Sequence, residues 1–155
     1  MLKNLDNDAQ FASALAHEVG HVVARHSIKC LQAIYGYSIV MEVALGDKIG
    51  KVARQAVDAA TGLILQGYGR ENEYEADDYG VLYAKKAGDN PKGMVQLFEK
   101  FKALEGKPPN AFEKLLLSHP PAKDRIDNAN KQIKTVGGID LPYFETEYSA
   151  VKAKL

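Results

Sequence analysis

The sequence predicts a mainly α-helical domain with little or no β-structure. Apolar residues recur at three- and four-residue spacing along most of the 155 residues, which is the periodicity of amphipathic helices. Glycine and proline pairs interrupt this pattern at intervals, and alternating runs typical of strands are scarce. A chain of this length suits one domain that can bury a core without disulfides.

The first predicted helix runs from Asp8 to about His26, with Asp6 or Asn7 as its N-cap. It has an apolar stripe on one side and two histidines among small residues on the other. We expect both sides to be covered, with another element packed closely against the histidines. The stripe consists of Phe11, Leu15, Val19, Val22 and Val23, and the small residues are Ser13, Ala14 and Ala24.

The middle of the chain predicts further helices. Residues 28–45 are the most apolar stretch, but charged residues and glycines interrupt it, so it predicts a buried helix or helix pair and no membrane span. The next helix is predicted over 49–66 and ends at Gly67 and Gly69, and another covers 70–87.

The remaining predicted helices are separated by proline and glycine pairs. Asn90 and Pro91 predict the start of a helix whose apolar face includes Met94, Leu97 and Phe98. Further helices are predicted over 111–117, 122–133 and 145–155, with an extended segment over 141–144.

Composition and charge exclude several classes of partner and site. The 20 basic and 20 acidic side chains give a formal net charge of zero, so no field gathers nucleic acid or anionic lipid. The single cysteine, Cys30, can neither form an internal disulfide nor supply a thiolate zinc site. The first residues lack the basic-then-apolar pattern of a signal peptide.

The first predicted helix carries His17-Glu18-Val19-Gly20-His21, an H-E-x-x-H motif. On a helix the two histidines lie one turn apart on the same face, so both imidazoles can bind one tetrahedral Zn²⁺. Glu18 then points to the side where an activated water would lie, as a general base requires. The alternative is a pair of incidental surface histidines, which the rarity of the motif disfavours.

A zinc site with two histidines needs a third ligand, commonly a carboxylate, and the acidic segment 71–78 offers candidates. Glu73 and Asp77 are four residues apart and share a helix face with Gly80 and Ala84. We therefore place Glu73 on the metal, and Asp77 behind a histidine ligand as acceptor of its spare N–H. The alternative is an acidic helix start favoured by the helix dipole. The acids expected in solvent are Glu71, Glu75 and Asp78.

Two further histidines need separate interpretation. A longer zinc motif would place its third histidine at position 27, where this chain has Ser27, so we expect a structural role for His26. His119 precedes Pro120 and Pro121, which restrict its backbone. A histidine held in this way could donate to a developing oxyanion, and the alternative is a loop histidine with no role.

Three motifs in this order resemble one family. They are H-E-x-x-H at 17–21, E-x-x-A-D-x-x-G at 73–80, and S-H-P-P at 118–121 followed by Arg125-Ile126. The chain resembles, over roughly residues 5–133, the zinc metallopeptidases (gluzincins) that include HtpX, the CAAX prenyl endopeptidases and soluble periplasmic proteases such as BepA and LoiP.

The resemblance implies a zincin-like catalytic core that binds one Zn²⁺ per chain and acts on polypeptides. It implies His17, His21 and Glu73 as zinc ligands, Glu18 as the catalytic carboxylate, and His119 in the active site as oxyanion donor or additional ligand. Arg125 is close enough in sequence to reach back to Glu73 or Asp77.

We therefore expect a zinc endopeptidase that hydrolyses misfolded or envelope proteins, in the periplasm or cell envelope. The catalytic core is assigned to 1–136 and a C-terminal extension to 137–155. Family members have a β-element ahead of the zinc helix, and only 16 residues precede His17, so we expect that element to be missing from this chain. The alternative is a non-cleaving or latent metal-stabilised module that binds unfolded client proteins. It would be latent if His119 completes the coordination shell of the metal.

Overall fold

A computed structural model describes residues 2–45, 51–104 and 123–154. Within these ranges the chain forms helices and no strand, so the prediction of a mainly α fold is confirmed. The elements are the 3-10 helix η1 (Leu2–Asn4) and the α-helices α1 (Asp8–Val23), α2 (His26–Leu45), α3 (Lys51–Ala87), α4 (Gly93–Leu104), α6 (Lys123–Val136) and α7 (Glu145–Lys152). The helix predicted over 111–117 lies outside the described residues.

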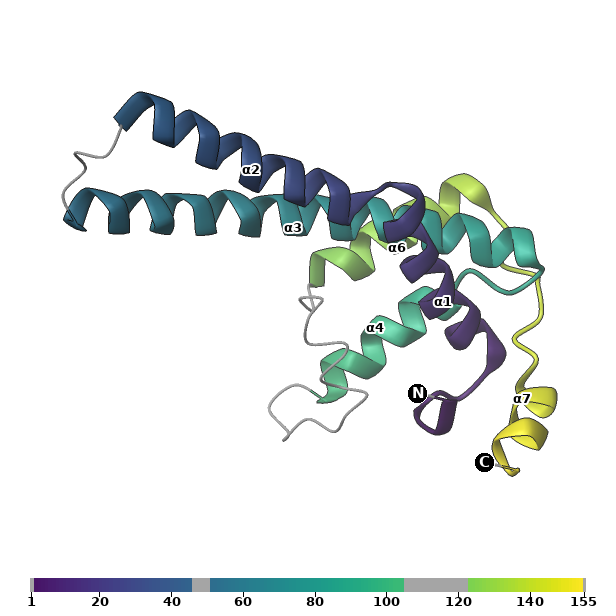
Figure 1. Cartoon of the computed structure of the whole chain (residues 1–155). Helices are drawn as coiled ribbons and strands as arrows, with labels where there is room; N and C mark the ends of the chain where they lie inside the picture. Colours follow the sequence, from purple (N-terminus) through teal and green to yellow (C-terminus); the bar gives the residue numbers. More distant parts are fainter. Residues whose placement is uncertain (1, 46–50, 105–122, 155) are drawn as a thin grey trace.

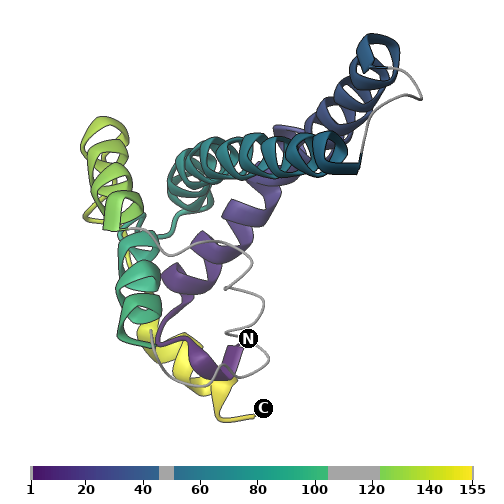
Figure 2. The ribbon, with the colours of Figure 1, turned by 90° about the vertical axis from the view of Figure 1, so that its left-hand side faces the viewer.

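The helices form a body and a long arm (Figure 1). α2 and the first half of α3 run antiparallel and project away from the body, while the second half of α3 packs against α1 and α6. α4 completes the body by packing against α1 and α6. The two ends of the chain lie together near α7, far from the tip of the arm (Figures 1 and 2).

The arm differs from the predicted arrangement in two ways. The expected break at Gly67 and Gly69 does not occur, and α3 runs through both positions as one helix of 37 residues. A glycine inside a helix costs only about 1 kcal/mol, which does not by itself end the helix. α2 is not buried as predicted, because Ile28, Leu31 and Tyr35 are more than half exposed. No helix among the described residues has the length and hydrophobicity that crossing a membrane requires.

α1 begins where its cap predicts and ends earlier than expected. The side chain of Asn7 accepts a hydrogen bond of 2.9 Å from the backbone N–H of Gln10, which confirms Asn7 as the N-cap. The helix ends at Val23, and Arg25 then adopts a positive φ of 56° before α2 begins.

The two faces of α1 are not both covered, so that expectation is wrong. Four of the five residues of the apolar stripe are exposed, namely Leu15, Val19, Val22 and Val23. The buried side is instead the face of small and polar residues, which comprises Ala9, Gln10, Ser13, Ala14, Ala16, His17 and Gly20. α3 and α4 pack on this side because small residues let their backbones approach closely.

Two apolar clusters hold the body together. One joins Leu5, which follows η1, to α1, α4 and α7 through Ala14, Leu97 and Tyr148. The other joins α3, α4 and α6 through Val81, Met94, Phe98, Ala129 and Ile133. The predicted apolar face of α4 is confirmed, since Met94, Leu97 and Phe98 are all buried.

The residues predicted as a C-terminal extension pack against the start of α1. The backbone N–H groups of Asp8 and Ala9 donate to the Tyr143 carbonyl, and the Lys152 ammonium donates to the Leu5 carbonyl at 2.7 Å. Tyr148 is 5% exposed in the cluster beneath them. The boundary between 1–136 and 137–155 stays a prediction.

The surroundings of Asp89, which follows α3, predict that replacing this residue stabilises the protein in a pH-dependent way. Its Oδ1 is buried and has no hydrogen-bond partner among the described residues, and burial together with the charge of Asp8 raises its pKa. Because the folded-state pKa lies above the unfolded one, ionisation of Asp89 destabilises the fold as the pH rises through the folded pKa. Asp89→Asn should therefore raise Tm at pH 7, and the gain should vanish below about pH 4.

Circular dichroism melts at pH 7 and pH 4 measure this difference. Asp127→Asn, on the exposed side of α6, is the matched control and should leave Tm nearly unchanged at both pH values. An Asp89→Asn protein that melts no higher than the parent at pH 7 would contradict the prediction.

Candidate metal centre

The site lies where α1 crosses α3, and two glycines make the crossing close. A Cβ added at Gly20 would stand 2.9 Å from the Cβ of Tyr79 and 3.0 Å from the Ala76 carbonyl oxygen on α3. A Cβ added at Gly80 would stand 3.5 Å from the Cα of His17. The expectation that another element packs closely against the histidine face is thus confirmed, and that element is α3.

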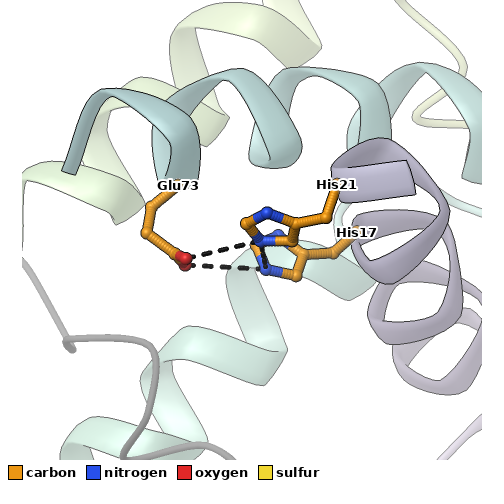
Figure 3. Close-up of side chains that lie close together, drawn as sticks. All are labelled: His17, His21 and Glu73. Carbon is orange, nitrogen blue, oxygen red and sulfur yellow. Dashed lines mark hydrogen bonds and ion pairs between the residues drawn. The ribbon is translucent and has the colours of Figure 1, made fainter. Parts of the chain in front are cut away.

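Three side chains converge at this crossing (Figure 3). His17 and His21 project from α1, and Glu73 projects toward them from α3. The two Nε2 atoms lie 3.1 Å apart, and the Glu73 oxygens lie 3.6 Å from that of His17 and 3.3 Å from that of His21. His17 and Glu73 are buried and His21 is half-buried, so one side of the group remains accessible. The three form a group that could hold one metal ion.

Asp77 and Arg125 lie directly behind these residues. Asp77 Oδ1 is 2.9 Å from His17 Nδ1, the nitrogen that faces away from Glu73. Arg125 of α6 donates two hydrogen bonds to Asp77, of 2.7 Å from Nε and 2.6 Å from Nη2, and its Nη1 lies 3.1 Å from Glu73 Oε2. The guanidinium also lies 4.5 Å from the centre of the Phe98 ring. One buried cation therefore contacts both buried carboxylates.

Three acids of the same helix were expected in solvent, and only Glu71 is exposed. Asp78 is half-buried and accepts a hydrogen bond of 2.9 Å from Asn128, and burial raises its pKa. Glu75 interacts with His26, whose ring Nε2 lies 3.1 Å from Glu75 Oε2. That hydrogen bond lowers the pKa of Glu75. Glu75 and Asp78, which were expected in solvent, are thus only partly solvated, and each has a side-chain partner.

His26 is 4% exposed and does not belong to the converging group, in keeping with a structural role. Its Nδ1 lies 2.8 Å from Nδ1 of His21. The sequence interpretation missed this contact because it continued the first helix to His26. On an unbroken helix, residues five apart point about 140° away from each other. The signal that could have revealed the contact is the charged and polar run Arg25-His26-Ser27, where the apolar pattern stops.

Of the remaining two predicted site residues, the structure describes Glu18 but not His119. Glu18 lies on α1 beside His17 and is exposed, on the accessible side of the helix. His119 lies outside the described residues, so its proposed role in the site stays a prediction.

The arrangement has the dimensions of a tetrahedral metal site. Zinc–ligand bonds of about 2.0–2.2 Å at tetrahedral angles place neighbouring ligand atoms roughly 3.3–3.6 Å apart. The two Nε2 atoms are 3.1 Å apart, and the distances of 3.3 Å to Glu73 Oε1 and 3.6 Å to Glu73 Oε2 are also close to these values. Two imidazoles with one carboxylate is also a ligand set used by catalytic zinc, which leaves one position for water or substrate. The residues therefore fit a zinc ion.

Comparison with known families agrees with this geometry. The sequence matches the model of peptidase family M48 over residues 1–133. The chain belongs to peptidase family M48. The resemblance inferred from the three motifs is thus confirmed, and the matched residues include the helices α1 to α4.

Several curated proteins are similar to this M48 chain. Metalloprotease YcaL of Escherichia coli K12 is 31% identical over 135 residues, which cover 85% of the chain and 52% of YcaL. Metalloprotease LoiP of the same strain is 26% identical over 140 residues, 88% of the chain and 54% of LoiP. The β-barrel assembly-enhancing protease of that strain is 25% identical over 139 residues, 82% of the chain and 28% of the protease. The M48 chain thus spans about half the length of these relatives or less. No solved structure matches it significantly.

Gly20→Ala in the M48 chain should separate α1 from α3. The added Cβ would meet the Ala76 backbone and the Tyr79 Cβ, neither of which is the flexible end of a side chain, so the helices must shift. Overpacking of this kind costs about 1–3 kcal/mol. The shift would also move Glu73 away from the two histidines and weaken zinc binding. Urea unfolding and chelator competition measure the two effects.

Gly36→Ala is the matched control, because Gly36 also lies inside a helix and has no atom within 4 Å of its added Cβ. This change should stabilise the protein by about 0.5–1 kcal/mol and leave zinc affinity unaltered. If both alanines shift stability in the same direction, the close crossing does not explain the effect at Gly20.

Proposed function

We propose that this chain is the catalytic core of a zinc-dependent endopeptidase. His17, His21 and Glu73 hold one Zn²⁺ per chain, and Glu18 serves as the general base. The observation that carries the proposal is the convergence of two imidazole nitrogens and the Glu73 carboxylate at separations of 3.1–3.6 Å. Glu18 is exposed and follows His17 directly in α1. Membership of peptidase family M48 and the names of the metalloprotease relatives support a peptidase role.

In this mechanism each residue has a separate task. A bound zinc ion supplies an activated water at neutral pH and polarises the scissile carbonyl. Glu18 accepts the proton of the attacking water and returns it to the leaving amine. Asp77 holds the His17 ring through Nδ1, and Arg125 keeps Glu73 and Asp77 in place while balancing their charge. His119 donates a hydrogen bond to the developing oxyanion.

The proposed substrates are misfolded or envelope polypeptides, and the proposed location is the periplasm or cell envelope. The support is the motif resemblance to periplasmic proteases and the relatives named for enhancing β-barrel assembly. Both statements are proposals, because the chain spans only about half the length of these relatives or less.

Zinc content and casein cleavage, each with and without a chelator, test the proposal. The chain should bind one zinc ion and cleave casein, and the chelator should abolish cleavage. Loss of an outer partner costs 10–100-fold in metal affinity, so loss of the ligand in Glu73→Ala should cost more than about 100-fold. Glu71→Ala is the control, since Glu71 is exposed on the same helix.

Two results would contradict the proposal. If Glu73→Ala binds zinc as tightly as the parent, Glu73 is not a ligand. If the zinc-loaded chain holds casein without cutting it, the chain is the non-cleaving client-binding module.

A further inference from the structure

The outer nitrogens of the two histidines have different partners. His17 Nδ1 faces the carboxylate of Asp77 at 2.9 Å, which is a common arrangement behind a metal ligand. His21 Nδ1 faces another imidazole, with His26 Nδ1 at 2.8 Å and the two rings edge to face at an interplanar angle of 77°. His26 is buried, and its other nitrogen, Nε2, lies 3.1 Å from Glu75 Oε2.

A break between two helices builds this contact. α1 ends at Val23 and α2 begins at His26, with Arg25 between them at a φ of 56°. Residues other than glycine adopt positive φ in only a few per cent of cases. The break turns His26 back over His21, whereas an unbroken helix would carry it about 140° away. The chain therefore adopts an uncommon backbone conformation at the point where it places an imidazole on His21.

The contact determines where the protons lie on both rings. His21 Nε2 faces Glu73 and the His17 ring, so a metal bound there requires a lone pair on Nε2 and the proton on Nδ1. That N–H donates to His26 Nδ1, which must then be unprotonated. The proton of neutral His26 is consequently on Nε2, where it donates to the Glu75 carboxylate. One half-buried carboxylate thus sets the tautomer of two successive imidazoles.

We propose that His26 and Glu75 are positioning residues for His21, which fix its tautomer and ring orientation so that Nε2 faces the metal. The inference rests on the proposed zinc site and extends it by two residues. A ligand histidine whose outer N–H is held by an acceptor binds metal more tightly, and loss of such a partner costs 10–100-fold in affinity. Asp77 performs this task for His17, and the pair His26 and Glu75 performs it for His21.

The first test needs no metal and no activity. Nitrogen-15 NMR of the imidazoles in the metal-free parent, at a pH where the histidines are neutral, reports which nitrogen of each ring carries the proton. We expect Nδ1–H on His21 and Nε2–H on His26. A His21 ring protonated on Nε2 in the parent would overturn the proposal.

The second test uses variants of His26 and measures zinc affinity by chelator competition. His26→Phe keeps a ring but removes the acceptor, so zinc affinity should fall 10–100-fold and His21 should lose its Nδ1–H preference. His26→Asn restores an acceptor and a donor, and should recover part of both. Unchanged affinity and an unchanged tautomer in His26→Phe would overturn the proposal.

Glu75→Ala and Lys29→Met distinguish the effect of Glu75 on His26 from the effect of the nearby charge of Lys29. Glu75→Ala should weaken zinc binding, because it frees His26 to reverse its tautomer. Lys29, which is exposed and lies 3.5 Å from Glu75, should tolerate Met with less than about a two-fold change. The outcome is independent of proteolysis. A chain that binds zinc without cleaving casein refutes the proposed function only. A His21 ring whose tautomer does not depend on His26 refutes this inference only.

Discussion

Glu18→Gln is expected to leave zinc binding intact and to reduce peptide hydrolysis by about 10²–10⁴-fold. General acid–base catalysis contributes a factor of this size, and an amide can neither accept the proton of the attacking water nor return it to the leaving amine. The proposed ligands are His17, His21 and Glu73, and Glu18 is not among them, so the zinc content should stay at one per chain. Single-turnover cleavage of a fluorogenic peptide, together with metal analysis, measures both quantities.

The control for this variant is Glu99→Gln, which makes the same chemical change on an exposed residue of α4. It should leave both hydrolysis and zinc content unchanged. Hydrolysis by Glu18→Gln within about three-fold of the parent would show that another group moves the proton.

Arg125→Met should destabilise the metal-free protein by about 3–5 kcal/mol. Arg125 is 5% exposed, and its guanidinium contacts both Asp77 and Glu73, which are themselves buried. Removing one partner from a buried ion pair leaves a charge without compensation, and such changes cost this much. Urea unfolding in the presence of a chelator measures the loss, because bound zinc would add its own stabilisation.

Two further variants show whether the loss of stability in Arg125→Met comes from its buried contacts. Arg125→Lys keeps the charge but cannot form the paired hydrogen bonds to Asp77, so its stability should lie between those of the parent and Arg125→Met. Lys134→Met removes an exposed cation from the same helix and should change stability by less than about 0.5 kcal/mol. If Arg125→Met costs no more than Lys134→Met, the buried contacts contribute nothing to the fold.

The parts of the fold that depend only on residues close together in the sequence could be predicted. The Asn7 cap and the apolar face of α4 are local features, and both are as predicted. The predicted stop at Gly67 and Gly69 failed because helix propensity is a weak preference that a long helix can override. The apolar stripe of α1 was misjudged because periodicity shows that a face is apolar and not which face the rest of the chain covers.

The site could be predicted to the extent that helical spacing and motifs define it. The pairing of His17 with His21 follows from one helical turn, and the face shared by Glu73 and Asp77 follows from the same spacing. That Arg125 contacts both acids depends on how α6 packs on α3, which no local pattern specifies. The contact of His26 with His21 depends on one backbone conformation at Arg25, which ends a helix that the apolar pattern would continue.

The attachment of the C-terminal residues to α1 has a consequence for the order in which the protein assembles. The N–H groups of Asp8 and Ala9 in the first turn of α1 find their acceptor in the Tyr143 carbonyl, and Leu5 packs against Tyr148. During synthesis α1 is made before the segment that contains Tyr143 and Tyr148. The helix that carries His17 and His21 can therefore complete the contacts of its first turn only after that later segment has been made.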